Sequence, residues 1–173
     1  MIELKLSTCV VRSYREADAD SIAPLANNRE IWINLRDAFP HPYTLDHARA
    51  FIRDAIEALP QTRMAIVVDG AAVGGIGFTL HPDVERVSAE IGYWLGEPFW
   101  GRGIVTDAVK AVTAHAIRTH HLTRVFALPY EWNHASCRVL EKAGYVREAR
   151  MRRSAIKDGR VIDQMLYAYV PDL

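Results

Sequence analysis

The chain has 173 residues, of which 50% are apolar and 24% charged, a composition that excludes a disordered segment and suits a well-buried core. Lysine plus arginine equals aspartate plus glutamate at 21 each, so charge gives no argument for a nucleic-acid or anionic-membrane partner. Cys9 and Cys137 lie far apart, and the seven histidines lack ligand spacing, so we expect neither a disulfide framework nor a metal. The amino-terminal residues contain no long apolar run, and we therefore expect no signal peptide, no membrane span and a cytoplasmic location.

The amino-terminal third is predicted to form one strand and three helices. The strand covers residues 8–13, and two short helices cover residues 17–27 and 31–38, the second ended by two nearby prolines. Thr44 is a suitable N-cap for a longer helix, which the spacing of its apolar residues extends to Leu59.

A β-hairpin and a further strand follow. Residues 64–68 and 73–80 flank Asp69-Gly70, a dipeptide typical of a tight hairpin turn. Residues 87–95 alternate between apolar and polar side chains, and this period of two predicts a strand.

A glycine-rich loop, residues 96–103, then leads into a long amphipathic helix. Apolar residues recur along that helix at i, i+3, i+4, i+7 and i+11, which predicts one buried stripe. Its members are Val105, Ala108, Val109, Val112 and Ala116.

Such a loop before a helix is a physical device for binding an anion. The first N–H groups of a helix have no intrahelical partner, the helix dipole is positive there, and glycine lets a phosphate approach closely. Neither the P-loop pattern nor the Rossmann fingerprint is present. The candidates to hold a pyrophosphate are the N–H groups of six residues, with the Arg102 side chain and the Thr106 hydroxyl in addition: Gly101, Arg102, Gly103, Ile104, Val105 and Thr106.

The last part of the chain reads as strand, helix and hairpin. Residues 125–128 form the strand, and Asn133 caps a helix that Gly144 ends. Residues 145–156 and 161–170 form a terminal hairpin. Two strands joined by a helix imply parallel pairing, so the sequence predicts a mixed sheet with helices packed on it.

Two segments resemble the GNAT acetyltransferases. Residues 90–108 read E-I-G-Y-W-L-x(3)-F-W-G-R-G-I-V-T-D-A and resemble the acetyl-CoA-binding segment of that family. Residues 133–145 resemble the N-x-x-S-x(5)-K-x-G-[FY] segment of its RimJ/RimL-like group, which acetylates ribosomal-protein N-termini and related amines. The resemblance covers the chain, loosely before residue 60.

The resemblance implies a single GNAT domain over residues 1–173, with an α+β fold. We expect a central twisted mixed sheet of about seven strands with helices on both faces. In that fold the parallel strands, here residues 88–95 and 124–128, splay apart, and the pantetheine arm of acetyl-CoA lies between them.

The same resemblance assigns further contacts to acetyl-CoA. The backbone around Ile91, Tyr93, Trp94 and Leu95 would bind pantetheine, and Asn133 is either a helix cap, a pantetheine contact or both. Trp100 either packs on acetyl-CoA or closes the loop as a core aromatic.

Two residues are candidates for the chemistry. By the resemblance, Ser136 would hydrogen-bond the leaving thiolate; its alternative role is to satisfy backbone N–H groups at a helix start. Glu90 is the candidate base for the incoming ammonium, directly or through water, and its alternative is an edge or solvent-facing carboxylate. A backbone N–H of the strand would stabilise the oxyanion. Some RimL-like relatives carry an acidic residue before the final turn where residues 151–156 have none, so base and acceptor stay open.

The predicted function is transfer of an acetyl group from acetyl-CoA to a primary amine by direct attack in a ternary complex. A protein or peptide N-terminus is the first acceptor hypothesis. A small-molecule amine (an amino acid, polyamine or antibiotic) and a non-catalytic acyl-CoA-binding module are alternatives, and a homodimer is left open. Aromatic residues are candidates for the walls of the acceptor site: Trp32, Phe39, Tyr43, Tyr130 and Trp132.

Two features receive a structural interpretation. Cys137 is expected to be a small buried side chain rather than a nucleophile. The arginines near residue 150 are expected to form a solvated strand face, with an acidic peptide or the CoA 3′-phosphate as alternative ligands. They are Arg147, Arg150, Arg152 and Arg153.

Overall fold

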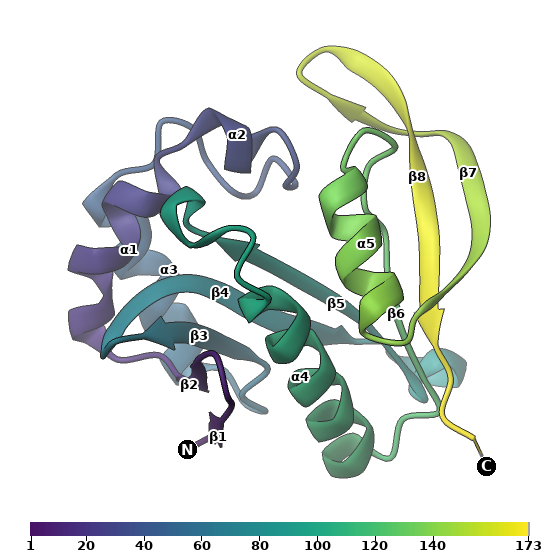
Figure 1. Ribbon diagram of the computed structural model, residues 1–173, viewed down its shortest axis with the longest axis horizontal. Helices are drawn as coiled ribbons and strands as arrows, with labels where there is room; N and C mark the ends of the chain where they lie inside the picture. The colour runs from purple at the N-terminus through teal and green to yellow at the C-terminus, as the bar shows by residue number, and fades with distance from the viewer. Residues whose placement is uncertain (173) are drawn as a thin grey trace. The chain divides into compact units, whose positions relative to one another are not determined.

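The computed structural model describes residues 1–172 (Figure 1). Short 3-10 helices are labelled η. In chain order the elements are β1 (Glu3–Lys5), β2 (Val10–Ser13), η1 (Glu16–Asp18), α1 (Ala19–Ala26), α2 (Arg29–Trp32), α3 (Leu45–Glu57), β3 (Arg63–Val68), β4 (Ala71–Leu80), η2 (Asp83–Glu85), β5 (Ser88–Leu95), η3 (Glu97–Phe99), α4 (Ile104–His120), β6 (Arg124–Ala127), α5 (His134–Lys142), β7 (Val146–Lys157) and β8 (Arg160–Tyr169).

Within residues 1–172 the strands form one mixed sheet of eight, in the order β1-β2-β3-β4-β5-β6-β8-β7. The β5–β6 pair is parallel, whereas β1–β2, β2–β3, β3–β4, β6–β8 and β7–β8 are antiparallel. The predicted α+β mixed sheet and its parallel pair are confirmed. The parallel register joins residues 88–90 to residues 124–126, and β5 then continues to Leu95.

The chain forms two compact units, which are described one by one. The first holds residues 1–77 and 93–108, and the second holds residues 78–92 and the chain from Val109 onward. The expectation of a single domain over residues 1–173 stays a prediction.

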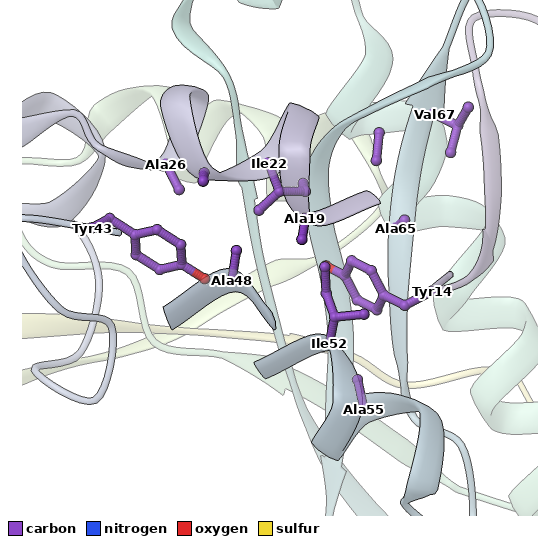
Figure 2. Packing of buried hydrophobic residues seen from close by; sticks show 12 residues of the cluster. Tyr14, Ala19, Ile22, Ala26, Tyr43, Ala48, Ile52, Ala55, Ala65 and Val67 are labelled. Atoms are coloured by element: carbon purple, nitrogen blue, oxygen red, sulfur yellow. The ribbon is translucent and has the colours of Figure 1, made fainter. Parts of the chain in front are cut away.

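A hydrophobic cluster fills the first unit (Figure 2). Ile22 of α1 and Ile52 of α3 are fully buried in it beside Tyr14. Burying an isoleucine side chain contributes roughly 1.5–3 kcal/mol, so these two helices are held mainly by this packing. Thr44 caps α3 as predicted, since its hydroxyl accepts the His47 N–H at 3.2 Å. The helix ends at Glu57 rather than at the predicted Leu59.

An ion pair that the sequence does not reveal lies beside this cluster. The Arg12 guanidinium donates to both carboxylate oxygens of Asp18 at 2.8 Å, and both side chains are buried. The Arg12 Nη1 also donates to the Ser13 carbonyl, and Asp18 accepts the Arg15 N–H. These bonds compensate the cost of burying both charges.

Three amino-terminal predictions need correction. The strand predicted at residues 8–13 begins at Val10, and β1, which pairs with it, was not predicted. The helix predicted at residues 17–27 is divided into η1 and α1. The helix predicted at residues 31–38 is α2, which begins under the Asn28 cap and ends at Trp32, where turns take over.

α5 belongs to the second unit, whereas α4 has residues 104–108 in the first unit and its remainder in the second; both helices have the predicted patterns. Ala108 is followed along α4 by Val109, Val112 and Ala116, all fully buried, whereas Val105 of the predicted stripe is only half-buried. α5 ends before Gly144, whose φ of +91° suits the residue after a helix. The terminal hairpin turns at Asp158 and Gly159, both with positive φ. Across residues 1–172 we find no helix that could cross a membrane.

Candidate functional site

The loop before α4 has the geometry that an anion site requires. Gly101 and Gly103 have φ values of +76° and +77°, a left-handed conformation that strains any residue with a Cβ. A Cβ built on either glycine would have no heavy atom within 4 Å. The glycines are therefore required by backbone conformation, and the space beside them is open to a phosphate.

The first turn of α4 begins at Gly103. The Asp107 N–H donates to the Gly103 carbonyl at 3.1 Å, which makes Gly103 the N-cap. The N–H groups of Ile104, Val105 and Thr106 thus precede the hydrogen-bonded part of the helix. These are the groups predicted to face the pyrophosphate.

A carboxylate in this turn would repel a phosphate, but its charge is engaged elsewhere. Oδ2 of Asp107 accepts the hydroxyls of Thr8 at 2.9 Å and Ser7 at 3.1 Å, both from the turn between β1 and β2. These hydroxyls draw the carboxylate toward that turn. Sequence reasoning missed them because about a hundred positions separate them from Asp107, and no local pattern links the two segments.

The side chains of Trp100 and Arg102 contact the segment that precedes the two left-handed glycines. The Trp100 indole Nε1 donates to the Leu95 carbonyl at 2.7 Å, which closes the loop, but the residue is 46% exposed and is not a core side chain. The contact of Trp100 with acetyl-CoA stays a prediction. The Arg102 guanidinium lies 5.4 Å from the Phe99 ring centroid and donates to the Pro98 carbonyl. The Arg102 side chain thus folds back on η3, and its contact with a pyrophosphate stays a prediction.

The end of β5 has two different edges. The Gly96 N–H donates to the Val73 carbonyl at 2.8 Å, and the Trp94 carbonyl lies so close to β4 that a Cβ at Gly74 would meet it at 2.4 Å. Because backbone polar groups alternate along a strand, those of Tyr93 and Leu95 point to the opposite edge. Of the predicted pantetheine contacts at the end of β5, Tyr93 and Leu95 therefore present their backbone away from β4, whereas Trp94 presents its backbone to β4.

In this unit the aromatic side chains predicted to line an acceptor site are Trp32, Phe39 and Tyr43, and Phe39 lies beside Tyr43 and also beside Trp94. Its ring centroid lies 4.7 Å from that of Tyr43 and 5.7 Å from that of Trp94. Trp32 stacks on His41 at 5.6 Å. Phe39 and Trp94 both pack against the hydrophobic cluster, so they serve the core of the unit at least in part.

Glu90 belongs to the second unit and lies at the end of the parallel register, opposite Phe126. It is half-buried between fully buried Ala89 and Ile91, so its side chain lies on the other face of β5 from theirs. Half-burial leaves open the alternative of an edge or solvent-facing carboxylate. The role of Glu90 as a base stays a prediction.

Asn133 and Ser136 meet at the start of α5. The Asn133 Oδ1 accepts the Ser136 N–H at 3.1 Å, which confirms Asn133 as the N-cap. Ser136 is half-buried on the first turn of the helix. Its backbone N–H is satisfied by the cap, and its hydroxyl is the group that could serve a thiolate.

Cys137 and the arginine-rich strand differ in part from expectation. Cys137 is half-buried rather than buried, and this burial raises the pKa of its thiol, which disfavours a nucleophilic thiolate. The arginines of β7 are exposed as predicted, although Arg150 is paired with Glu131 and Asp163. Tyr130 and Trp132, predicted for the acceptor walls, contact each other edge to face at 5.9 Å.

The predicted site residues are divided between the two units. The first unit contains Trp100, the loop from Gly101 to Thr106 and the end of β5 from Tyr93 to Leu95. The second contains Glu90, Asn133 and Ser136. Among residues 1–172 there is no cluster of three or more His, Cys, Asp or Glu side chains able to hold a metal ion.

Comparison with known proteins shows which family the chain resembles. The family model for the acetyltransferase (GNAT) domain matches residues 9–146. The ribosomal-protein-serine acetyltransferase of Escherichia coli (strain K12) is 31% identical over 100 residues, which cover 58% of this chain and 55% of that protein. The chain spans only a little over half the length of the first curated relatives that it matches.

Solved structures share the fold over nearly the whole chain. RimL, a ribosomal L7/L12 alpha-N-protein acetyltransferase in complex with coenzyme A, superposes with a TM-score of 0.86 at 21% identity over 98% of both chains. The microcin C7 self-immunity acetyltransferase MccE, in complex with acetyl-CoA and AMP, gives 0.84 at 20% identity over 96% of this chain and 94% of that one. At these identities the likeness establishes the fold.

Proposed function

Because the chain belongs to the GNAT acetyltransferase family, we propose that it transfers the acetyl group of acetyl-CoA to a primary amine. The observation that carries this proposal is the loop before α4, where two left-handed glycines leave open space beside the first N–H groups of the helix. A diphosphate fits there because unpartnered N–H groups and the positive helix end both favour an anion.

With the diphosphate bound at the loop before α4, the other contacts to acetyl-CoA can be assigned. The N–H groups from Gly101 to Thr106 hold the pyrophosphate, and the edge of β5 that Tyr93 and Leu95 present away from β4 pairs with the pantetheine arm. At Leu95 this pairing is through the N–H, because the Leu95 carbonyl accepts the Trp100 indole N–H. Trp100 keeps the loop closed through its bond to the Leu95 carbonyl. Trp94, whose backbone faces β4, has its role in packing.

The transfer itself needs little covalent chemistry from the protein. The amine nitrogen attacks the thioester carbonyl, a C–N bond forms, and the C–S bond breaks to release a thiolate, which takes up the proton that the nitrogen loses as it becomes an amide. A backbone N–H on the edge of β5 that faces away from β4 stabilises the oxyanion, and the Ser136 hydroxyl donates to the thiolate. Glu90 takes the proton that the ammonium must lose, directly or through water.

A protein or peptide N-terminus is the acceptor that we propose. The names of two similar proteins, the Escherichia coli ribosomal-protein-serine acetyltransferase and RimL, describe action on ribosomal proteins. The first of these is similar in sequence over more than half of this chain. That similarity supports a peptide acceptor over a small amine.

The test measures CoA release from acetyl-CoA against peptides with free N-termini, the same peptides with blocked N-termini, and small amines. We expect turnover with free N-termini only, and a loss of about 100-fold in kcat for Ser136→Ala with acetyl-CoA binding intact. Turnover with small amines alone would contradict the peptide acceptor and favour a small-molecule amine instead. Tight acetyl-CoA binding without turnover on any acceptor would favour a binding module.

A further inference from the structure

We propose that Arg150 is a positioning residue, which holds residues 129–132 against the β7–β8 hairpin and thereby sets the start of α5 where Ser136 lies. The inference rests on the proposed function, because it concerns the same Ser136 hydroxyl. Every residue that it uses belongs to the second unit.

Arg150 joins two carboxylates from different segments. Its Nη2 donates to Glu131 Oε2 at 3.0 Å, and its Nε donates to Asp163 Oδ2. The other oxygen of Asp163 accepts the Arg153 N–H at 2.8 Å, where β7 bulges and Arg153 has a φ of +54°. The Arg153 N–H and the Arg150 guanidinium lower the pKa of Asp163, so its carboxylate remains charged and fully able to accept both bonds.

The segment between β6 and α5 runs along β8 as if it were a short additional strand. The Glu131 N–H donates to the Asp163 carbonyl at 3.1 Å, and the Asp163 N–H returns to Glu131 Oε1 at 3.2 Å. The Met165 N–H donates to the Pro129 carbonyl at 2.8 Å. Arg150 clamps this contact from the side through Glu131.

The same segment carries the cap of α5. The Tyr130 carbonyl accepts the Asn133 N–H at 2.9 Å, and Asn133 Oδ1 accepts the Ser136 N–H at 3.1 Å. A displacement of Glu131 therefore moves its chain neighbour Tyr130, whose carbonyl holds the Asn133 N–H. Asn133 in turn holds the Ser136 N–H, so the displacement reaches Ser136. The planar fork of an arginine suits this task, because it fixes direction as well as distance.

The Arg150 side chain is 56% exposed, and exposed ion pairs contribute little to global stability. Removal of the Arg150 guanidinium should therefore change the geometry at the start of α5 more than it changes the free energy of unfolding. A matched control pairs with the same strand, β7. Arg124 of β6 donates to both carboxylate oxygens of Glu148 and ties β6 to β7, at side-chain exposures of 29% and 39%.

The experiment compares Arg150→Gln with Arg124→Gln in the full chain. Hydrogen exchange of the Ser136 amide reports the order of the cap and needs no acceptor. We expect it to rise several-fold in Arg150→Gln and to stay near the unmodified rate in Arg124→Gln. In the CoA-release assay we expect kcat to fall by about 10-fold to 100-fold in Arg150→Gln only, with the KM for acetyl-CoA unchanged.

The decisive comparison adds Ser136→Ala to each variant. If Arg150 acts through Ser136, the loss in the double variant matches that of Ser136→Ala alone, whereas independent effects would multiply. Multiplied losses, or equal exchange in Arg150→Gln and Arg124→Gln, overturn the proposal. Full activity in Ser136→Ala alone would overturn the proposed role of Ser136 and with it any catalytic role of Arg150, whatever the exchange shows.

Discussion

Trp100 combines an exposed ring with a fixed indole N–H. Its Nε1 donates to the Leu95 carbonyl at 2.7 Å, so the bond fastens the end of β5 to the start of the glycine loop. Aromatic side chains in a loop are easily predicted as core residues, because sequence reveals apolar area but not the partner of the polar atom. The single hydrogen bond explains why a tryptophan can lie here in contact with solvent.

Trp100→Phe keeps the ring and removes the donor. A hydrogen bond of this kind contributes about 1 kcal/mol, so we expect the Kd for acetyl-CoA to rise by about fivefold while the free energy of unfolding changes by less than about 1 kcal/mol. Calorimetric titration and urea unfolding measure the two quantities. An unchanged Kd together with a clear loss of stability would contradict the loop-fastening role.

The buried and half-exposed ion pairs escaped prediction for a related reason. Arg12 pairs with Asp18 across the start of a helix, and Arg150 meets Asp163 only because β7 and β8 form a hairpin. Opposite charges are abundant in this chain, with 21 of each sign, so the sequence alone allows many ion pairs and does not distinguish among them. Only the folded backbone selects among them.

At the scale of elements, prediction succeeded where the signal is local. Asn133 and Gly144 delimit α5 because a cap oxygen and a left-handed glycine act within one turn of the helix. β1 was missed because its three residues have strand geometry only through pairing with β2. The network around Glu131 was missed for the same reason, since its bonds join segments remote in sequence.

Asn133→Ala removes the acceptor of the Ser136 N–H, whereas Asn133→Ser keeps a capping oxygen. We expect the alanine variant to lose about 1 kcal/mol of stability and about 3 °C in Tm, and the serine variant to lose much less. Thermal unfolding followed by circular dichroism measures both. Equal losses in the two variants would show that the side chain stabilises α5 by something other than its cap.

At the scale of the whole chain, stability should depend on pH through His115 of α4. Burial first, and then the positive charges of Arg118 and His120, lower the pKa of His115 below its ordinary 6.5. Just below pH 6.5, His115 therefore binds a proton in the unfolded chain but stays neutral in the folded chain. The free energy of unfolding consequently falls as pH decreases through this range. The lowered carboxylate pKa values of Glu148 and Asp163 act at more acidic pH.

His115→Gln should flatten this dependence. Urea unfolding at pH 7.5 and 5.5 gives the change in free energy across the window, with His134→Gln at an exposed histidine as the control. We expect a smaller loss between the two pH values in His115→Gln than in the unmodified chain or the control. The same loss in all three proteins would remove His115 as the cause.

The central claim is that the loop from Gly101 to Gly103 holds the pyrophosphate of acetyl-CoA, and a comparison of two glycines tests it most directly. Gly70, in the turn between β3 and β4, has a φ of +83° and open space beside it, as Gly101 does at +76°. Gly101→Glu and Gly70→Glu should therefore share a backbone strain of about 1–2 kcal/mol. Calorimetric titration with acetyl-CoA should show binding weakened by at least about 100-fold in Gly101→Glu and unchanged in Gly70→Glu. Equal affinity in the two variants would contradict the account.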